Sequence, residues 1–156
     1  MPKKPYPPFI LLAGILINIA AGMSGWPTGL EIEISHFWTR NLIVPMGVAL
    51  MLLGLMAGIS VSRQFKAYET SIVPDHRPAS IISDGLFAYS RNPIYLSMVV
   101  ILVGAALISG NGTGFFIAFG FGVWVRWRWI PLEEANMRRA FGAEFEAYCQ
   151  AVRRWI

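Results

Sequence analysis

The sequence predicts an all-α integral membrane protein. We expect four transmembrane helices, a cytoplasmic amphipathic helix at the C-terminal end and a loop over the cytoplasmic mouth of the bundle. First, 55% of the 156 residues are hydrophobic and only 14% are charged, whereas soluble domains carry about 25% charged residues. Second, four apolar stretches are long enough to cross about 30 Å of hydrocarbon as helices. Third, basic residues gather in alternate connecting segments. Residues 1–156 are expected to form one domain, because no repeat or linker divides them.

The first of the four stretches is preceded by two lysines and followed by small residues, as in a cleavable signal peptide. We favour a retained span, because cleavage would break the charge pattern along the chain. Asn18 inside it is expected to form an interhelical hydrogen bond. Gly54 and Gly58, like Ala118 and Gly122, have a spacing that lets helix backbones approach closely. The predicted spans are Phe9–Trp26, Leu42–Ser62, Pro93–Ser109 and Thr113–Ile130.

The distribution of positive charge predicts the orientation of the chain. Of 13 Lys and Arg residues, only Arg40 lies between the first and second spans. The others lie before the first span, between the second and third, and from Arg126 onward. The positive-inside rule then places both termini in the cytoplasm. The compact form favours a prokaryotic inner membrane. The net charge of +4 indicates contact with anionic lipid headgroups and not with nucleic acid.

Two segments outside the spans are expected to be ordered. Residues 63–92 contain helix-breaking Pro and Gly but also many apolar side chains, so this loop is predicted to fold back over the bundle. After Pro131, apolar residues recur every three to five positions with charges between them. This pattern predicts an amphipathic helix over residues 131–152 that lies along the membrane interface, with an interruption at Gly142.

Two polar clusters flank the last two spans. Arg91-Asn92-Pro93-Ile94-Tyr95 opens the third span, and Glu133-Glu134 follows the fourth, so both clusters lie at the cytoplasmic end of one hairpin. Each has a structural explanation on its own: acids are favoured in the first turn of a helix, and Glu134 can pair with Arg138. Together with Arg126 they predict a mixed-charge pocket suited to a zwitterionic, partly aromatic cofactor. No metal site is expected.

Four sequence blocks, in their order and spacing, resemble the isoprenylcysteine carboxyl methyltransferase family, which includes the phospholipid N-methyltransferases. The similar region begins at Phe65 and includes Val152-Arg153-Arg154-Trp155 near the C-terminus. The four blocks are Gly85-Leu86-Phe87, Arg91-Asn92-Pro93-Ile94-Tyr95, Glu133-Glu134, and Phe141-Gly142 through Tyr148.

The resemblance implies an S-adenosylmethionine-dependent methyltransferase that binds its cofactor at the cytosolic face. One glutamate of the pair would bind the α-amino group of the cofactor, while Arg91 would hold its carboxylate or orient a glutamate. Arg91 and Glu133 are therefore the catalytic candidates. The cofactor-binding candidates are Gly85, Leu86, Tyr89, Arg91, Asn92, Pro93, Tyr95, Leu96, Glu133 and Glu134.

The acceptor is expected to be amphiphilic and to enter from the bilayer. We predict a carboxylate of a prenylcysteine-like or other lipid-like molecule, because an amine must lose a proton and neither His36 nor His76 is suitably placed to take it. N-methylation of a phospholipid or other amine is the alternative. A small transporter or a non-catalytic scaffold is a further alternative, although spans one to three hold no ionisable residue that a transporter would use.

Overall fold

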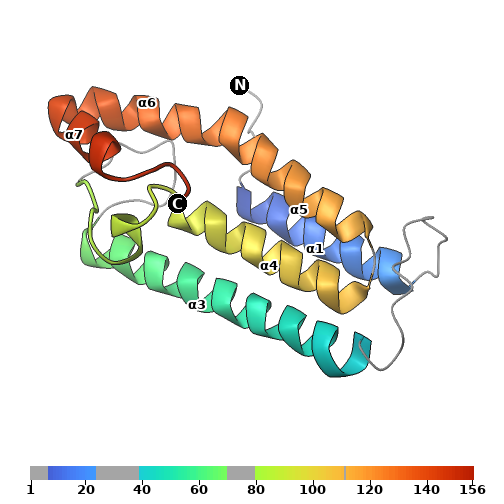
Figure 1. The fold of residues 1–156 in the computed structure, drawn as a ribbon. Coiled ribbons are helices and arrows are strands. Elements are labelled where there is room, and N and C mark those ends of the chain that lie inside the picture. The colour runs from blue at the N-terminus through green and yellow to red at the C-terminus, as the bar shows by residue number, and fades with distance from the viewer. Residues whose placement is uncertain (1–6, 24–38, 70–79, 111) are drawn as a thin grey trace.

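The computed structural model describes residues 7–23, 39–69, 80–110 and 112–156. All regular structure in these residues is helical, which confirms the predicted all-α class. Figure 1 shows α1, α3, α4 and α5 side by side, with α6 and α7 at the end where α4 begins. The elements are α1 (Pro7–Met23), a π turn (Thr39–Ile43), α3 (Val44–Ala67), a 3₁₀ turn (Gly85–Ala88), α4 (Pro93–Ser109), α5 (Thr113–Trp124), a second π turn (Val125–Trp129), α6 (Ile130–Phe141) and α7 (Ala143–Ala151).

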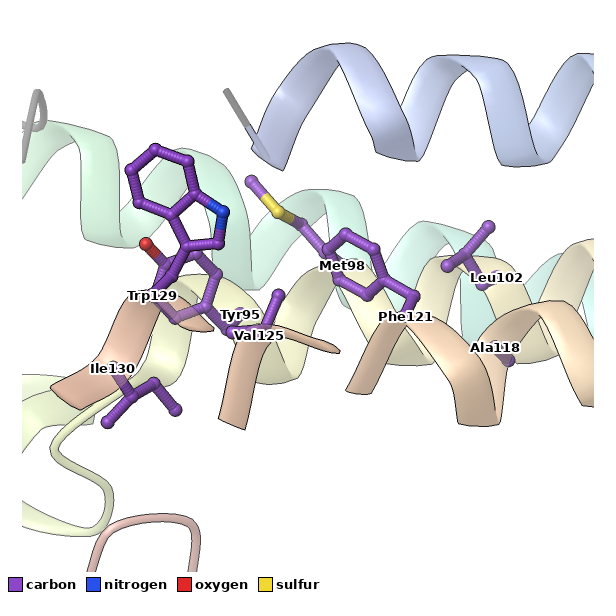
Figure 2. Close-up of a cluster of buried hydrophobic side chains, with 8 residues drawn as sticks. All are labelled: Tyr95, Met98, Leu102, Ala118, Phe121, Val125, Trp129 and Ile130. Carbon is purple, nitrogen blue, oxygen red and sulfur yellow. The ribbon is translucent and has the colours of Figure 1, made fainter. Parts of the chain in front are cut away.

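Helix α4 is the centre of the bundle, since it packs against α1, α3 and α5. Its bounds coincide with the predicted third span. Pro93 begins it, at the position where a missing N–H costs nothing, and Gly110 ends it with a left-handed φ of 64°. Tyr95 at its start and Leu102 in its middle are buried, and Figure 2 shows them facing side chains of the α5–α6 run.

Helices α3 and α4 approach so closely that their backbones touch. A Cβ atom added to Gly104 would lie 2.6 Å from the Gly47 carbonyl oxygen, and one added to Gly54 would lie 2.9 Å from the Ser97 carbonyl oxygen. The predicted contact at Gly54 is therefore confirmed. The hydrogen bond expected of Asn18 is also confirmed, because its Oδ1 accepts from Ser109 Oγ at 2.7 Å and joins α1 to α4.

The outer surface of the bundle is apolar. Phe9 in α1, Met56 in α3 and Phe119 in α5 are 68%, 61% and 73% exposed. An exposed apolar surface of this extent suits lipid and not water. Among the described residues, one helix, Asn41–Ala67, is long and apolar enough to cross a membrane, and its most apolar 18-residue stretch has a mean hydropathy of 2.4. Pro7–Ala20 and Pro93–Ser109 are shorter apolar helices, so the four predicted spans are not all of membrane length in the described residues.

Helical structure continues beyond the predicted end of the fourth span. We expected this span to end at Ile130 and a separate helix to begin at Pro131, whereas the helical run extends unbroken from Thr113 to Phe141 (Figure 1). Proline lacks the N–H of a helical bond and clashes with the preceding turn. The π turn accommodates it: the Ile130 N–H bonds to the carbonyl of Val125, five residues back.

The other predicted boundaries are closer to those of the structure. Helix α3 continues past Ser62 to Ala67, so part of the expected loop is helical. Gly142, with φ of 50°, separates α6 from α7 and confirms the predicted interruption. Residues 24–26 of the first predicted span, and residues 70–79 of the loop with His76, lie outside the described residues, as does His36.

Candidate functional site

The Arg91–Tyr95 turn and the glutamate pair meet where α6 passes the start of α4. The Tyr95 hydroxyl donates a short hydrogen bond to Glu133 Oε1, and Arg91 Nη2 donates to Glu134 Oε1 at 3.2 Å. These contacts join residues that are about forty positions apart in the chain. The structure therefore places the two polar clusters of the sequence side by side.

The turn before α4 has a conformation imposed by proline. Asn92 precedes Pro93, and its φ of −131° and ψ of 51° lie outside the helical region that proline disfavours for its neighbour. Asn92 is 6% exposed, and its backbone N–H donates to Ser90 Oγ at 3.2 Å. The turn thus fixes Arg91 and Tyr95 on either side of a buried, hydrogen-bonded residue.

Glu134 is surrounded by arginines. Its side chain is 6% exposed, and Arg154 donates to both of its oxygens, from Nε at 3.0 Å and from Nη2 at 2.7 Å. Arg91 donates to Oε1, and Arg138 Nη1 lies 3.7 Å from Oε2. The predicted Glu134–Arg138 pair is confirmed. Both oxygens are occupied and the negative charge is compensated, as a buried carboxylate requires.

Glu133 has different surroundings, although it is the next residue. Successive helical residues point about 100° apart, so Glu133 turns toward Tyr95 and away from the arginines. No salt bridge joins it to an arginine in the part of the chain that the structure describes. Burial raises the pKa of its carboxyl to about 7; the Tyr95 hydrogen bond lowers this pKa and the charge of Glu134 raises it further.

Arg91 is held by protein atoms on two sides. Besides Glu134, it donates from Nη1 to the Cys149 carbonyl oxygen at 3.2 Å. Its Nε is buried and lacks a hydrogen-bond partner among the described residues. The sequence left open whether Arg91 orients a glutamate or holds a ligand. In the structure Arg91 contacts Glu134, and its Nε is the side-chain nitrogen without a hydrogen-bond partner among the described residues.

In the described part of the chain, no hydrogen bond or salt bridge joins the three loop candidates to the glutamates. Gly85 has φ of 54° and lies against Gln64 at the end of α3, where a Cβ atom would come within 2.3 Å of Gln64 Nε2. Leu86 packs against the small apolar cluster that contains Phe87. Tyr89 is 76% exposed.

The loop is nevertheless tied to α7. The Tyr148 hydroxyl donates to the Phe87 carbonyl oxygen at 2.8 Å, and burial raises the pKa of Tyr148 to about 12. Pro93 is buried and Leu96 partly buried in the first turns of α4. Of the ten cofactor-binding candidates, hydrogen bonds join Arg91 to Glu134 and Tyr95 to Glu133, while Asn92 binds the backbone of Arg154, whose side chain binds Glu134.

The phospholipid methyltransferase family model matches residues 42–144 of the chain. The chain belongs to this family. The resemblance to the isoprenylcysteine carboxyl methyltransferases and phospholipid methyltransferases, predicted from the sequence, is thereby confirmed. The match extends from the π turn before α3 to the start of α7, and so includes both polar clusters. No significant match was found among the curated proteins or among the solved structures.

Several contacts of this methyltransferase-family chain were not predicted. The Arg154 side chain binds Glu134, and the carbonyls of Cys149 and Arg153 accept from Arg91. Arg154 and Arg153 lie beyond the segment that the family model matches. The only sequence signal was the similarity of Val152-Arg153-Arg154-Trp155, to which no role was attached.

An apolar surface groove of about 290 Å³ lies between α1, α4 and α5. Its lining includes Ile10 and Ile17 of α1, Leu102 of α4 and Trp124 of α5. Leu102 also belongs to the buried cluster of Figure 2, which contains Tyr95. The groove therefore borders the core that supports the polar site. Among the described residues, no group of three or more His, Cys, Asp or Glu side chains could hold a metal ion.

Proposed function

We propose that this protein is a membrane-embedded methyltransferase that uses S-adenosylmethionine to methylate a lipid headgroup at the cytoplasmic face. The observation that carries the proposal is the difference between the two glutamates. Glu134 is compensated by three arginines, whereas Glu133 has a tyrosine hydroxyl as its partner. Family membership supports methyl transfer as the reaction.

The residues present fit the amino-acid end of S-adenosylmethionine. An ammonium group needs a carboxylate partner, and a carboxylate needs N–H donors, in a partly dry site. Glu133 can supply the first, because no arginine competes for it in the described chain. Arg91 Nε, buried and unpartnered among the described residues, can supply the second. We therefore assign the α-amino group to Glu133 and the α-carboxylate to the neighbourhood of Arg91.

When bound, S-adenosylmethionine supplies an activated methyl group on a sulfonium centre. The task of the chain is then to orient the acceptor and exclude water. Tyr95 holds Glu133 in place by its hydrogen bond, and the Arg91–Glu134 contact holds α6 against α4. These contacts hold the polar residues in place, and methyl transfer requires little further chemistry from the chain.

We propose an amphiphilic acceptor, and the family favours a phospholipid amine over the carboxylate expected from the sequence. That expectation rested on the lack of a residue able to take a proton from an amine. With Glu133 assigned to the cofactor, the amine acceptor is supported by the family alone, and the proton would leave to water. The apolar surface groove beside α1 and α5, about 290 Å³ in volume, is suited to hydrocarbon of the acceptor.

The raised pKa of Glu133 favours a second candidate role, that of general base for a headgroup ammonium. The two roles differ in their effect on cofactor affinity. Glu133→Gln weakens S-adenosylmethionine binding if Glu133 holds the α-amino group. It leaves binding unchanged and lowers kcat if Glu133 is the base.

For the membrane arrangement, we propose that α1, α3, α4 and α5 all span the bilayer, with both termini cytoplasmic and a prokaryotic inner membrane as the location. The exposed apolar side chains on α1, α3 and α5 support this arrangement. Arg63 and Lys66 lie in the last turns of α3, whose C-terminal end is at the end of the bundle that carries α6 and α7 (Figure 1), and Arg91 lies in the site itself. The positive-inside rule puts that end in the cytoplasm.

The direct test is transfer of a radiolabelled methyl group from S-adenosylmethionine into lipid. Purified protein would be reconstituted in vesicles with phosphatidylethanolamine, or in vesicles of phosphatidylcholine and phosphatidylglycerol that lack a headgroup amine. We expect label in the lipid extract of the first vesicles, loss of label in Glu133→Gln, and full labelling in the exposed control Arg139→Gln. Absence of label from all vesicles, with protein that is folded, would contradict the proposal.

A further inference from the structure

The final segment of the chain, residues 152–156, returns to the polar end of the bundle. Where α7 ends, Val152 is extended, with φ of −123° and ψ of 133°, and the chain then runs toward the start of α4 (Figure 1). Val152 is 9% exposed, and Trp155 packs against the buried cluster that contains Tyr95. The segment is therefore anchored on the protein by apolar contacts.

Two backbone carbonyls of this segment accept hydrogen bonds from the turn that precedes α4. The Arg91 backbone N–H donates to the Arg153 carbonyl at 3.0 Å, and Asn92 Nδ2 donates to the Arg154 carbonyl at 2.9 Å. Asn92 is buried, so water could not readily replace the second bond. These bonds fix the position of the C-terminal segment relative to the turn.

The Arg154 side chain connects the same segment to α6. Its Nε and Nη2 donate to Glu134 Oε1 and Oε2 at 3.0 and 2.7 Å, which is a two-bond fork. A fork of this kind sets the angle between the groups as well as their distance. Glu133 is the neighbouring residue on α6, so a fixed Glu134 also fixes the direction in which Glu133 faces Tyr95.

We propose that Arg154 is a positioning residue of the methyl-transfer site, and that residues 152–156 are the element that aligns Glu133 with the Arg91–Tyr95 turn. This inference rests on the proposed function. Arg154 acts through Glu134 and touches no substrate. The amino-acid end of the cofactor is therefore recognised by a carboxylate whose orientation depends on residues 152–156, outside the segment that the family model matches.

The test is a double-mutant cycle in the Kd for S-adenosylmethionine, measured by calorimetry in detergent. Arg154→Gln should weaken binding about tenfold in the wild-type background and less than about twofold in the Glu134→Gln background, because the effect passes through Glu134. An undiminished tenfold loss in the Glu134→Gln background would mean that Arg154 contacts the cofactor itself, and would overturn the proposal.

Arg154→Lys tests whether Arg154 acts through the geometry of its hydrogen bonds or only through its charge. Lysine keeps the charge and the stabilising attraction to Glu134 but cannot form the fork, so we expect a thermal midpoint close to wild type and a Kd still about tenfold weaker. Full recovery of affinity by lysine would overturn the proposal. Arg139→Gln is the control for loss of one surface charge. Wild-type binding retained by every Arg154 variant would refute this inference alone, whereas a folded wild-type protein that binds no cofactor would refute the proposed function.

Discussion

At the scale of single residues, the adjacent Glu133 and Glu134 lie in different surroundings, so their replacement should change the free energy of unfolding by different amounts. Replacing Glu134 by Gln would remove the charge that compensates Arg91, whose side chain is 13% exposed. We expect a loss of about 3 kcal/mol in the free energy of unfolding, mostly from Arg91, because Arg138 and Arg154 are more exposed and contribute less. Glu133→Gln should change this free energy by less than about 1 kcal/mol, since it removes a carboxylate whose ionisation is already disfavoured. Denaturant unfolding in detergent measures both, and equal losses would contradict the division of roles.

The pKa of Glu133 makes cofactor binding depend on pH. Folding raises this pKa from 4.5 to about 7, so between these values the folded state holds a proton that the unfolded state has released. The associated stabilisation is complete below pH 4.5 and is lost as the pH rises to about 7. Cofactor binding needs the ionised carboxylate, so affinity should rise by up to about tenfold per pH unit below 7 and then level off. Calorimetry between pH 5.5 and 7.5 should show this slope in wild type and its absence in Glu133→Gln; a flat wild-type profile would exclude the assignment.

Tyr95 should set the midpoint of that profile. Its hydrogen bond stabilises the charged form of Glu133 and lowers the pKa of the carboxyl, in opposition to burial. Tyr95→Phe removes the hydrogen bond and keeps the ring in the core. The midpoint of the affinity profile should then move to higher pH by about one unit. A midpoint that stays in place, or moves to lower pH, would show that the hydroxyl does not act on Glu133.

At the scale of the elements, the contact between α3 and α4 depends on glycine. Gly104→Ala places a methyl group 2.6 Å from the Gly47 carbonyl oxygen, so the two backbones must separate. We expect a cost of about 1–3 kcal/mol, seen as a lower thermal midpoint in detergent. Gly120→Ala on α5 is the matched control, because a Cβ atom there meets nothing within 4 Å. Similar midpoints for the two variants would refute the close approach.

The elements also show what the sequence could predict. The bounds of α4 followed from Pro93 and the Ser109-Gly110 turn, because these signals are local. The continuation through Pro131 could not be predicted in the same way, since the π turn that admits this proline is a feature of the backbone over several residues. Proline at that position usually indicates a helix start, and here the helical run continues.

The residues of the candidate site could be predicted from the sequence, whereas the contacts between them could not. The two polar clusters were recognised because charged side chains stand out beside apolar spans. The partner of each glutamate was not recognised, because it depends on the rotation of α6 about its axis. Arg154 was assigned no role, since its contacts with Glu134 and Asn92 join residues 20 and 62 positions apart.

At the scale of the whole molecule, the proposed four-span arrangement predicts on which side each turn lies. In a Cys149→Ser background, single cysteines at Gly112, in the α4–α5 turn, and at Ala140, on α6, should react with a membrane-impermeant maleimide from opposite sides. Ala140 should be labelled only when the cytoplasmic side is accessible, and Gly112 only from the other side. Labelling of both from one side would contradict the four spans.

The central claim is that Glu133 is the carboxylate that receives the α-amino group of S-adenosylmethionine. The most direct measurement is calorimetric titration of S-adenosylmethionine into the purified wild-type protein, Glu133→Gln and the control Arg139→Gln. We predict saturable binding by wild type and Arg139→Gln, and affinity lower by about tenfold or more in Glu133→Gln. No binding by folded wild-type protein, or wild-type affinity in Glu133→Gln, would contradict it.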